Sequence, residues 1–490
     1  MSADVLLGMV MLLPLGCAGA IVLARGNPNL REAISLLTGA ALFASVLALT
    51  AAVRGGDVPA LVLAEPIPGL RLHLSPEPLG LLFAMLAGLL WPITVTFAIG
   101  YMRGLGESSQ TRFYACMALS VTATLGIAMA GDMLTLFLFY ELLTLATFPL
   151  VTHAGTAAAR RAGRIYLGIL MGTSMSMLLL ATAITYRTTG TLDFQPGGVF
   201  GSDFDPRLLS VALILFVFGA SKAALMPFHR WLPNAMVAPT PVSALLHAVA
   251  VVKAGVFTIL KVSVYLFGID TLASLDGAVV MRSVAAFTIL AASLIALRTD
   301  NLKLRLAYST VSQLAYIVMG AMLATSAGMV GSGMHLVMHA FGKITLFFCA
   351  GAILVGSRRK YVSEMDGLGR KMPITMAAFT VGALSLIGLP PTGGTWSKWM
   401  LLQGTMDAGT ISLMVVLLIS AILNLAYLLV IPVRAYFAEP QVSKSPALPM
   451  EEVTESPLAC RIAFGLTSFG CILGFAFPEP LWAFVQEAIG

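Results

Sequence analysis

The chain has 490 residues, of which 58% are hydrophobic and 11% are charged, and its mean hydropathy is +0.92. This composition excludes a soluble globular protein, because a soluble core does not need so much apolar surface. The net charge of +6 does not indicate nucleic-acid binding, since membrane proteins collect Lys and Arg in their cytoplasmic loops.

Apolar runs of about 18 or more residues recur along the chain, which is the pattern of a polytopic helical membrane protein. The first run starts almost at Met1 with no Lys or Arg before it, so we expect a transmembrane helix rather than a cleavable secretory signal. The sequence predicts an all-α protein with about 14 transmembrane helices, at residues 5–24, 32–53, 79–101, 113–130, 133–151, 164–186, 207–226, 240–267, 277–297, 303–325, 329–355, 374–403, 410–437 and 460–485.

The loops between these segments carry an asymmetric charge. Loops on one side contain most of the Lys and Arg, including Lys444, and those on the other side contain only Arg54, Arg71, Arg187, Arg207 and Arg282. Because positively charged loops stay in the cytoplasm, both termini are expected on the outer, periplasmic side of a bacterial inner membrane.

No motif for a cofactor or metal is present. The chain lacks GxGxxG, Walker and HExxH sequences. Its cysteines are far apart in the sequence and form no CxxC pair, which disfavours an iron–sulfur cluster, a zinc site or a disulfide framework. They are Cys17, Cys116, Cys349, Cys460 and Cys471. We therefore expect no cofactor.

Charged residues inside the apolar segments are the first functional signal. A charge at the bilayer centre costs at least about 2.5–3.5 kcal/mol, so such residues are usually functional. Glu141 is the one acidic residue deep in a segment, whereas Asp132 is expected at a helix edge in contact with water. The lysines inside segments are Lys222, Lys253, Lys261, Lys343 and Lys398; Lys261 could equally extend its ammonium to the membrane surface.

Two of these lysines lie beside interruptions of their helices. Lys222 is in "FGASKAALMPFHRWLP" and Lys398 follows "LIGLPPTGG". Broken helices persist at membrane depth only where protein or a water-filled cavity satisfies the freed backbone groups. A lysine beside a break in each half of the chain indicates a transport pathway at a repeat interface; the alternative is a proline kink with an incidental lysine.

Histidines extend the set of titratable groups. His247 and Lys253 are six residues apart, and His335, His339 and Lys343 are spaced four and four, which places these three on one helical face. Histidine titrates near physiological pH and suits a proton relay. The alternatives are histidines hydrogen-bonded within a core, or a metal site on His335 and His339.

Four stretches resemble the proton-translocating antiporter-like subunits of respiratory complex I, membrane-bound hydrogenases and Mrp-type Na+/H+ antiporters. They are "KAALMPFHRWLPNAMVAPTPVSALLHAVAVVKAG", "LAYSTVSQLAYIVMG", "HLVMHAFGKITLFFCAGAI" and "GLPPTGGTWSKWMLL". The resemblance implies helices 1–3 with an outer hairpin loop over 1–112, inverted five-helix repeats over 113–267 and 276–437, and a loop with helix 14 over 438–490. It also implies that helices 7 and 12 are discontinuous.

The resemblance also assigns roles to single residues. Glu141 matches the helix-5 glutamate that pairs with the helix-7 lysine, here Lys222. The remaining residues of the family's proton path correspond to His247, Lys253, His335, His339, Lys343 and Lys398. Where many members read "HAFFK" this chain reads "HAFGK", which changes the packing beside Lys343.

The segment "FYELLTLATFPLVTH" and the helix-12 lysine look most like the D-type subunit of Mrp antiporters. This resemblance implies a transport subunit rather than an enzyme, with other membrane subunits as partners and H+ and Na+ as transported ions. One alternative is the pumping arm of a hydrogenase or complex I-type oxidoreductase. Another is a membrane partner that energises a soluble carbon- or bicarbonate-handling protein.

Overall fold

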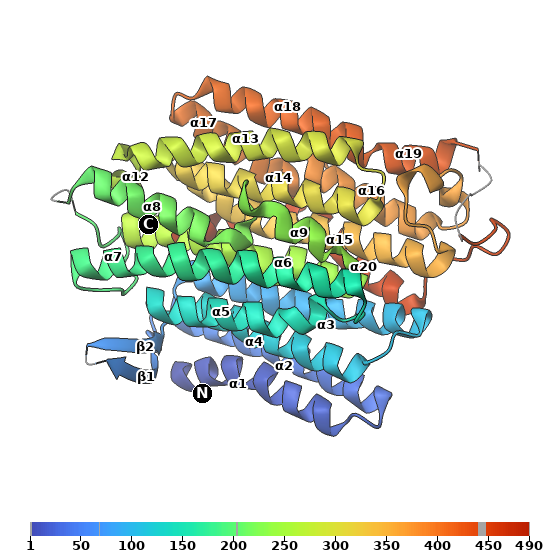
Figure 1. Cartoon of the computed structure of the whole chain (residues 1–490), viewed down its shortest axis with the longest axis horizontal. Helices are drawn as coiled ribbons and strands as arrows, with labels where there is room; N and C mark the ends of the chain where they lie inside the picture. The colour runs from blue at the N-terminus through green and yellow to red at the C-terminus, as the bar shows by residue number, and fades with distance from the viewer. Residues whose placement is uncertain (1, 68, 202–203, 440–446, 490) are drawn as a thin grey trace.

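The computed structural model describes residues 2–489 except 68, 202–203 and 440–446, so that Lys444 lies outside the described residues. The helices run roughly along the longest axis of the molecule, with a β hairpin and the C-terminal helix at one end (Figure 1). The hairpin pairs β1 (Leu61–Ile67) with β2 (Leu70–Leu74) in antiparallel register. The chain is therefore a helical membrane protein with one small sheet in its described part.

The first half of the chain contains twelve α-helices among its described residues. They are α1 (Ala3–Leu23), α2 (Pro28–Arg54), α3 (Pro78–Leu105), α4 (Gln110–Met129), α5 (Met133–Val151), α6 (Ala157–Thr173), α7 (Leu179–Thr189), α8 (Pro206–Gly219), α9 (Trp231–Asn234), α10 (Thr240–Ala244), α11 (Val251–Val262) and α12 (Ile269–Ser274). Short π-helical turns join α6 to α7 and α10 to α11, so each pair forms one continuous span; these turns are Ser174–Leu178 and Leu245–Val249.

The second half also contains long helices, with an interruption between α16 and α17. Its helices are α13 (Asp276–Arg298), α14 (Leu302–Met322), α15 (Ser326–Ser357), α16 (Pro373–Ile387), α17 (Gly394–Asp407), α18 (Ile411–Leu428), α19 (Val430–Phe437), α20 (Leu458–Ala476) and α21 (Glu479–Ile489). Several long helices begin at a polar residue whose side chain accepts a hydrogen bond from the first-turn backbone, as helix N-caps do; these are Asn27, Asp132, Thr156, Asn301 and Thr325.

Eleven spans in the described part are long and apolar enough to cross a membrane. The interrupted segments around α8 and α16 are shorter apolar helices, so the exact count of 14 stays a prediction. The expected segment 460–485 was wrong at its end: α20 stops at Ala476 and α21 starts separately at Glu479, with Pro478 between them. Proline cannot donate the backbone hydrogen bond that would continue the helix.

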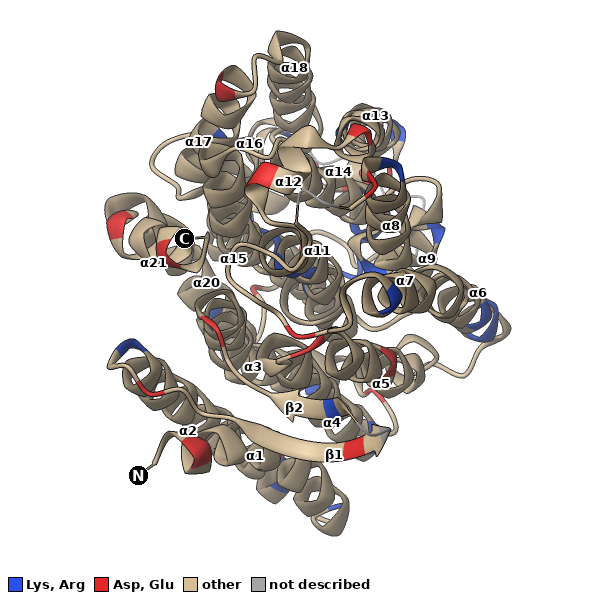
Figure 2. Ribbon diagram, turned by 90° about the vertical axis from the view of Figure 1, so that its left-hand side faces the viewer, with Lys and Arg blue, Asp and Glu red and all other residues tan. Residues whose placement is uncertain are grey.

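The helices form a buried centre and a lipid-facing periphery. The most apolar stretch of the span Thr240–Phe267 is 100% buried, compared with 33% for α2 and for Ile411–Phe437. Seen from the hairpin end, α11 lies near the middle of the bundle, among α3, α8, α14 and α15 (Figure 2). The titratable residues of this central span are thus separated from lipid by other protein.

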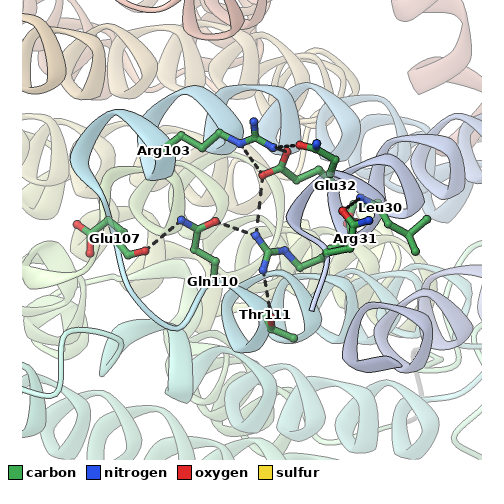
Figure 3. Close-up of polar contacts among 10 residues, drawn as sticks. Leu30, Arg31, Glu32, Arg103, Glu107, Gln110 and Thr111 are labelled. Carbon is green, nitrogen blue, oxygen red and sulfur yellow. Dashed lines mark hydrogen bonds and ion pairs between the residues drawn. The ribbon is translucent and has the colours of Figure 1, made fainter. Parts of the chain in front are cut away.

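At the opposite end, a polar network ties the N-terminal helices to the bundle (Figure 3). The Arg103 guanidinium donates to both carboxylate oxygens of Glu32, at 3.1 and 2.5 Å. Arg31 donates to Gln110 (2.8 Å) and Thr111 (3.1 Å). Arg31 and Glu32 are each only 4% exposed, so the network fixes the first turn of α2 against the end of α3 and the start of α4.

Replacing Glu32 with alanine should lower the free energy of unfolding by about 1–3 kcal/mol, because it removes two charge-assisted hydrogen bonds and leaves the buried Arg31 without its neighbouring carboxylate. Glu487→Ala is the matched control, since Glu487 pairs with Arg54 between half-exposed side chains. That control should change stability by about 0.5 kcal/mol or less. Thermal unfolding of the purified protein in mild detergent measures both, and equal losses in the two variants would contradict this account.

Candidate functional site

The first helix break presents Lys222 to the centre of the bundle. Helix α8 ends at Gly219, and Lys222 lies in the single 3₁₀ turn that follows. This turn packs directly on α11 at Gly255, where an added Cβ would lie 2.4 Å from the Lys222 carbonyl carbon, so a larger residue could not occupy position 255. The Ser221 carbonyl oxygen accepts from the Ala224 N–H at 2.9 Å and from the Trp231 indole at 3.0 Å, so protein donors satisfy the backbone beside the break.

Lys222 is fully buried and interacts with α5. Its ammonium donates to the Tyr140 carbonyl oxygen at 2.7 Å and lies 3.1 Å from the centre of the Tyr140 ring. Glu141, the next residue, is 7% exposed, and neither of its carboxylate oxygens has a hydrogen-bond partner among the described residues. The structure therefore brings Lys222 to the helix turn that carries Glu141, but the ammonium contacts a backbone carbonyl, and no ion pair to Lys222 is present in the described part.

The second helix break lies between α16 and α17 and places Lys398 in the interior. Helix α16 ends at Ile387, and Gly388 follows with φ +91°, a conformation that favours glycine. Lys398, on α17, donates to the carbonyl oxygens of Leu386 (2.7 Å) and Ile387 (3.1 Å). These are last-turn carbonyls of α16, where the helix dipole favours a cation. The Trp396 indole donates to Phe475 of α20, so a tryptophan again supports the broken segment.

Between the two breaks, Lys253 meets His339. The Lys253 ammonium on α11 lies 2.8 Å from His339 Nδ1 on α15 and donates to the Leu336 carbonyl oxygen at 2.7 Å. Lys253 is fully buried and His339 is 1% exposed. When Lys253 carries a proton as an ammonium, it can only donate, and His339 Nδ1 then accepts with the imidazole proton on Nε2. Two bases that share one hydrogen bond can exchange a proton without any large movement.

His335 continues the path from His339 toward Lys398. The rings of His335 and His339 are 5.9 Å apart, as expected for residues four apart on α15. His335 Nδ1 lies 2.9 Å from the hydroxyl of Ser397, the residue before Lys398. Tyr316 contacts both His335 and Lys398. Its ring stacks on the His335 imidazole, and the Lys398 ammonium lies 4.9 Å from the centre of the Tyr316 ring.

His247 and Lys343 are both held by polar residues of α14. His247 Nδ1 lies 3.0 Å from the Thr310 hydroxyl, and the ring packs on Phe347. The Lys343 ammonium donates to the Ser309 hydroxyl at 2.9 Å and more weakly to the Leu306 carbonyl oxygen at 3.3 Å. His247 belongs to the π-helical turn before α11, and such turns are frequent at functional sites.

The contacts place these residues in three buried polar groups: Lys222 against α5, His247 and Lys343 against α14, and Lys253 with His339 and His335 between α11, α15 and α17. Several polar atoms of these groups have no partner among the described residues, including Nε2 of His247, Nε2 of His339 and Nε2 of Gln313. Buried polar atoms in native proteins are normally hydrogen-bonded to protein or to water, so these atoms indicate internal hydration. The described residues contain no group of three or more His, Cys, Asp or Glu side chains that could hold a metal ion.

Lys261 and Asp132 differ from expectation. The Lys261 ammonium does not extend to the membrane surface: it is fully buried, 2.7 Å from Glu77 Oε1 and 2.6 Å from the Ala130 carbonyl oxygen. Asp132 is not in open contact with water, because it is 2% exposed, caps α5 by accepting from Thr135 and pairs with His73 at 3.1 Å. An ionised carboxylate can be buried when such partners replace its hydration.

Sequence reasoning missed the polar residues that support the titratable ones. Ser309, Gln313 and Tyr316 are spaced four and three apart within the quoted motif "LAYSTVSQLAY", a helical face that predicts one polar stripe. Each now contacts a titratable group, namely Lys343, His335 and Lys398 respectively. The sequence does not single out Glu77 as the partner of a buried lysine. A carboxylate followed by proline is common at helix N-termini whether or not it forms an ion pair.

Comparison with known proteins gives one family and several relatives. Residues 130–424 match the family described as NADH:quinone oxidoreductase/Mrp antiporter, TM. NADH-quinone oxidoreductase subunit N of Desulforudis audaxviator is 32% identical over 407 residues, which cover 82% of this chain and 79% of that protein. F(420)H(2) dehydrogenase subunit L of Methanosarcina mazei is 32% identical over 338 residues, but the match spans about half of that longer protein (48%).

Two solved structures share the fold. A chain of the Mrp complex from Dietzia sp. DQ12-45-1b superposes with a TM-score of 0.86 and 23% sequence identity, and the match covers 100% of this chain and 97% of that one. A chain of the membrane-bound sulfane sulfur reductase, an archaeal respiratory membrane complex, gives a TM-score of 0.85 at 22% identity, covering 98% and 96%. The arrangement of helices is therefore that of these two membrane complexes' chains.

The His73–Asp132 pair predicts a pH dependence of stability. The hydrogen bond to Asp132 raises the pKa of His73 above its ordinary value, so the pair stabilises the folded protein fully below about pH 6.5. This contribution is lost as the pH rises through the higher folded-state pKa. We expect the thermal unfolding temperature of the detergent-solubilised protein to fall between pH 6 and pH 9, and His73→Gln to reduce that fall.

His153→Gln is the control, because burial lowers the pKa of His153 and its contribution to stability therefore changes with pH in the opposite direction. If both variants retained the full pH dependence of the original protein, His73 would not be its source.

Proposed function

Because the chain belongs to the NADH:quinone oxidoreductase/Mrp antiporter transmembrane family, we propose that it is the D-type, proton-translocating subunit of a multisubunit Mrp cation/proton antiporter. The support for the D type is the segment "FYELLTLATFPLVTH" together with Lys398 on the second broken helix. Its partners would be the other membrane subunits of that complex. H+ would move through this chain, and Na+ would be exchanged for it by the assembly.

The observation that carries the proposal is the contact of Lys253 with His339 in the buried centre of the bundle. Two titratable groups on different helices meet there at hydrogen-bond distance, with no lipid contact. Charged groups at such depth are costly and are retained where they transfer ions or protons. The proposed path runs laterally from His247 and Lys343, beside α14, through Lys253, His339 and His335 to Lys398.

Glu141 and Lys222 would control this path. In the structure the Lys222 ammonium donates to the Tyr140 carbonyl oxygen, while both Glu141 oxygens lack a partner among the described residues. A small movement of the lysine side chain would exchange the neutral carbonyl for the adjacent carboxylate. An opposite charge nearby favours the charged amine, so leaving Glu141 favours release of the proton toward Lys253.

We propose the same domain division and orientation as the sequence predicts. The repeats would comprise 113–267 and 276–437, flanked by 1–112 and 438–490; the last segment includes residues 440–446, which lie outside the described part. The basic loops would face the cytoplasm, and both termini would face outward from the bacterial inner membrane.

A redox-driven assembly is the second candidate, since the relatives include subunit N of an NADH-quinone oxidoreductase and subunit L of a F(420)H(2) dehydrogenase. The chain would then pump protons without performing the redox step itself. Mild solubilisation of the native complex and mass spectrometry of its subunits distinguish the two. Small membrane subunits alone favour the antiporter, whereas iron–sulfur or flavin subunits favour the oxidoreductase.

Replacing Glu141 or Lys222 with alanine should reduce proton transport at least tenfold while the complex still assembles. The reason is that each change removes one charge of the proposed switch. Transport is measured as the quenching of a pH-sensitive dye in inverted membrane vesicles, and assembly as the recovery of all subunits on affinity purification.

Lys371→Ala is the matched control, because Lys371 is an exposed loop lysine outside the proposed path. It should leave transport unchanged. Normal transport in either Glu141→Ala or Lys222→Ala would refute the assignment.

A further inference from the structure

A cavity of about 750 Å³ opens at the end of the molecule that carries the basic loops. Its walls come from the loops after α3 and before α10, the start of α14, and the end of α15 with the segment that follows it. Among the described residues that line it, one side chain is a carboxylate, Glu107, and four are cations, namely Lys303, Arg358, Arg359 and Lys360. A cavity of this size holds a small ligand, and the excess of positive charge favours an anion.

Backbone hydrogen bonding fixes the two segments that supply these cations. The Leu302 N–H, at the start of α14, donates to the Lys360 carbonyl oxygen at 2.9 Å. Lys303 is the next residue of α14, and its ammonium donates to the Ala238 carbonyl oxygen at 2.5 Å. Asn301, which caps α14, also lines the cavity, so the N-terminus of this helix adds a partial positive charge there. The cations therefore lie on one hydrogen-bonded wall.

The carboxylates of the adjoining loops bind other groups and do not neutralise this wall. Glu364 accepts from two backbone N–H groups at the start of its 3₁₀ turn. Asp300 accepts from the N–H and the hydroxyl of Ser363, and Asp366 pairs with Arg434 at 2.7 Å. None of the four lining cations forms an ion pair in the part of the chain that the structure describes.

Arg359 has an unused hydrogen-bond donor beside the cavity. Its side chain is buried, with the residue only 4% exposed, and one terminal nitrogen donates to the Glu364 carbonyl oxygen at 2.7 Å. Its Nε has no partner among the described residues. Buried donors are normally satisfied by protein, water or a bound group. A guanidinium is shaped to donate two parallel hydrogen bonds to a phosphate, which makes an oxyanion a suitable partner.

Orientation in the membrane explains basic loops in general, but it does not explain their convergence on a cavity. Arg370 and Lys371 belong to the same basic loop, yet both are exposed and neither lines the cavity. A smaller cavity of about 560 Å³ at the opposite end has the reverse charge, because its described lining residues include Glu77, Asp193 and Glu487 and no Lys or Arg. The charge of each cavity is thus set by local packing.

We propose that the basic cavity binds a phosphate group, carried by a free phosphorylated compound or by the headgroup of an anionic phospholipid. Several cations suit a phosphate, which carries up to about two negative charges, better than a singly charged carboxylate. Basic pockets between helices on the cytoplasmic side are known to hold lipid phosphates. Apolar residues of the same cavity, Leu105, Val237 and Leu354, would contact the rest of the ligand. The inference goes beyond the proposed function and does not depend on it.

The first test measures binding of inorganic pyrophosphate to the purified, detergent-solubilised complex by isothermal titration calorimetry. Sodium acetate at equal ionic strength serves as the reference. Arg358→Gln/Lys360→Gln should weaken binding at least about tenfold, because it removes two charge-assisted donors. Arg370→Gln/Lys371→Gln is the matched control, since it removes the same charge from exposed residues outside the cavity, and it should stay within about twofold of the original. Equal weakening in both variants would show attraction by overall charge and would overturn the site.

The second test examines the lipid source of the phosphate. The delipidated complex is mixed with micelles that contain cardiolipin or, as the zwitterionic reference, phosphatidylcholine, and retained lipid is counted by native mass spectrometry. Retention of cardiolipin that is lost in Arg358→Gln/Lys360→Gln but kept in Arg370→Gln/Lys371→Gln assigns the site to a lipid headgroup. Pyrophosphate binding with the same dependence, without such retention, assigns it to a free compound. If neither probe depends on Arg358 and Lys360, the proposal is overturned.

A protection experiment tests the site even if the double variant fails to assemble. Val237 lines the cavity and is 44% exposed, whereas Ala158 is exposed and does not line it. Saturating pyrophosphate or cardiolipin should slow the reaction of Val237→Cys with a maleimide at least fivefold and leave the rate of Ala158→Cys unchanged, with the unsubstituted protein as the blank. Unchanged rates at both positions with both probes would overturn the proposal.

Discussion

The structure depends on how positively charged side chains are stabilised at membrane depth. Lys222 and Lys398 each lie beside a helix break, but the partners of their ammonium groups differ. The Lys398 ammonium donates to the carbonyl oxygens of Leu386 and Ile387, which are free because α16 ends there. The Lys222 ammonium donates to the Tyr140 carbonyl oxygen within the continuous helix α5 and lies over the Tyr140 ring. In the second half the break therefore supplies the carbonyls that stabilise the buried cation, whereas in the first half the break places the lysine against α5.

Support for the breaks comes from the surrounding helices. The Trp231 indole donates to the Ser221 carbonyl oxygen at the first break, and the indole of Trp396, which follows the second break, donates to the Phe475 carbonyl oxygen of α20. Gly255 lets the turn that carries Lys222 pack on α11. The first break thus packs on α11 and the second on α15, the two helices where Lys253 and His339 meet. The packing keeps these titratable groups buried inside the bundle, away from lipid.

Helix α14 contacts several of the buried titratable residues, although its own central turns contain no charged residue. Its polar residues contact Lys343, His335, Lys398 and His247. Its first turn lines the cavity at the basic end. Hydroxyl and amide groups cost less to bury than ions, so α14 can hold these titratable neighbours without carrying a charge at its own centre.

The sequence by itself determined the class of protein, most of the helix boundaries and the set of buried titratable residues. Hydropathy and charge act over short stretches of chain, so "LFLFYELLTLATF" and "GLPPTGGTWSKWM" already predict a buried carboxylate and a broken helix. Only the tertiary structure decided which groups meet. Lys222 contacts the Tyr140 carbonyl rather than Glu141, Lys261 pairs with Glu77, and Asp132 is buried against His73. These partners are about 60 to 180 residues apart in the chain, and their contact depends on helix packing that no local pattern encodes.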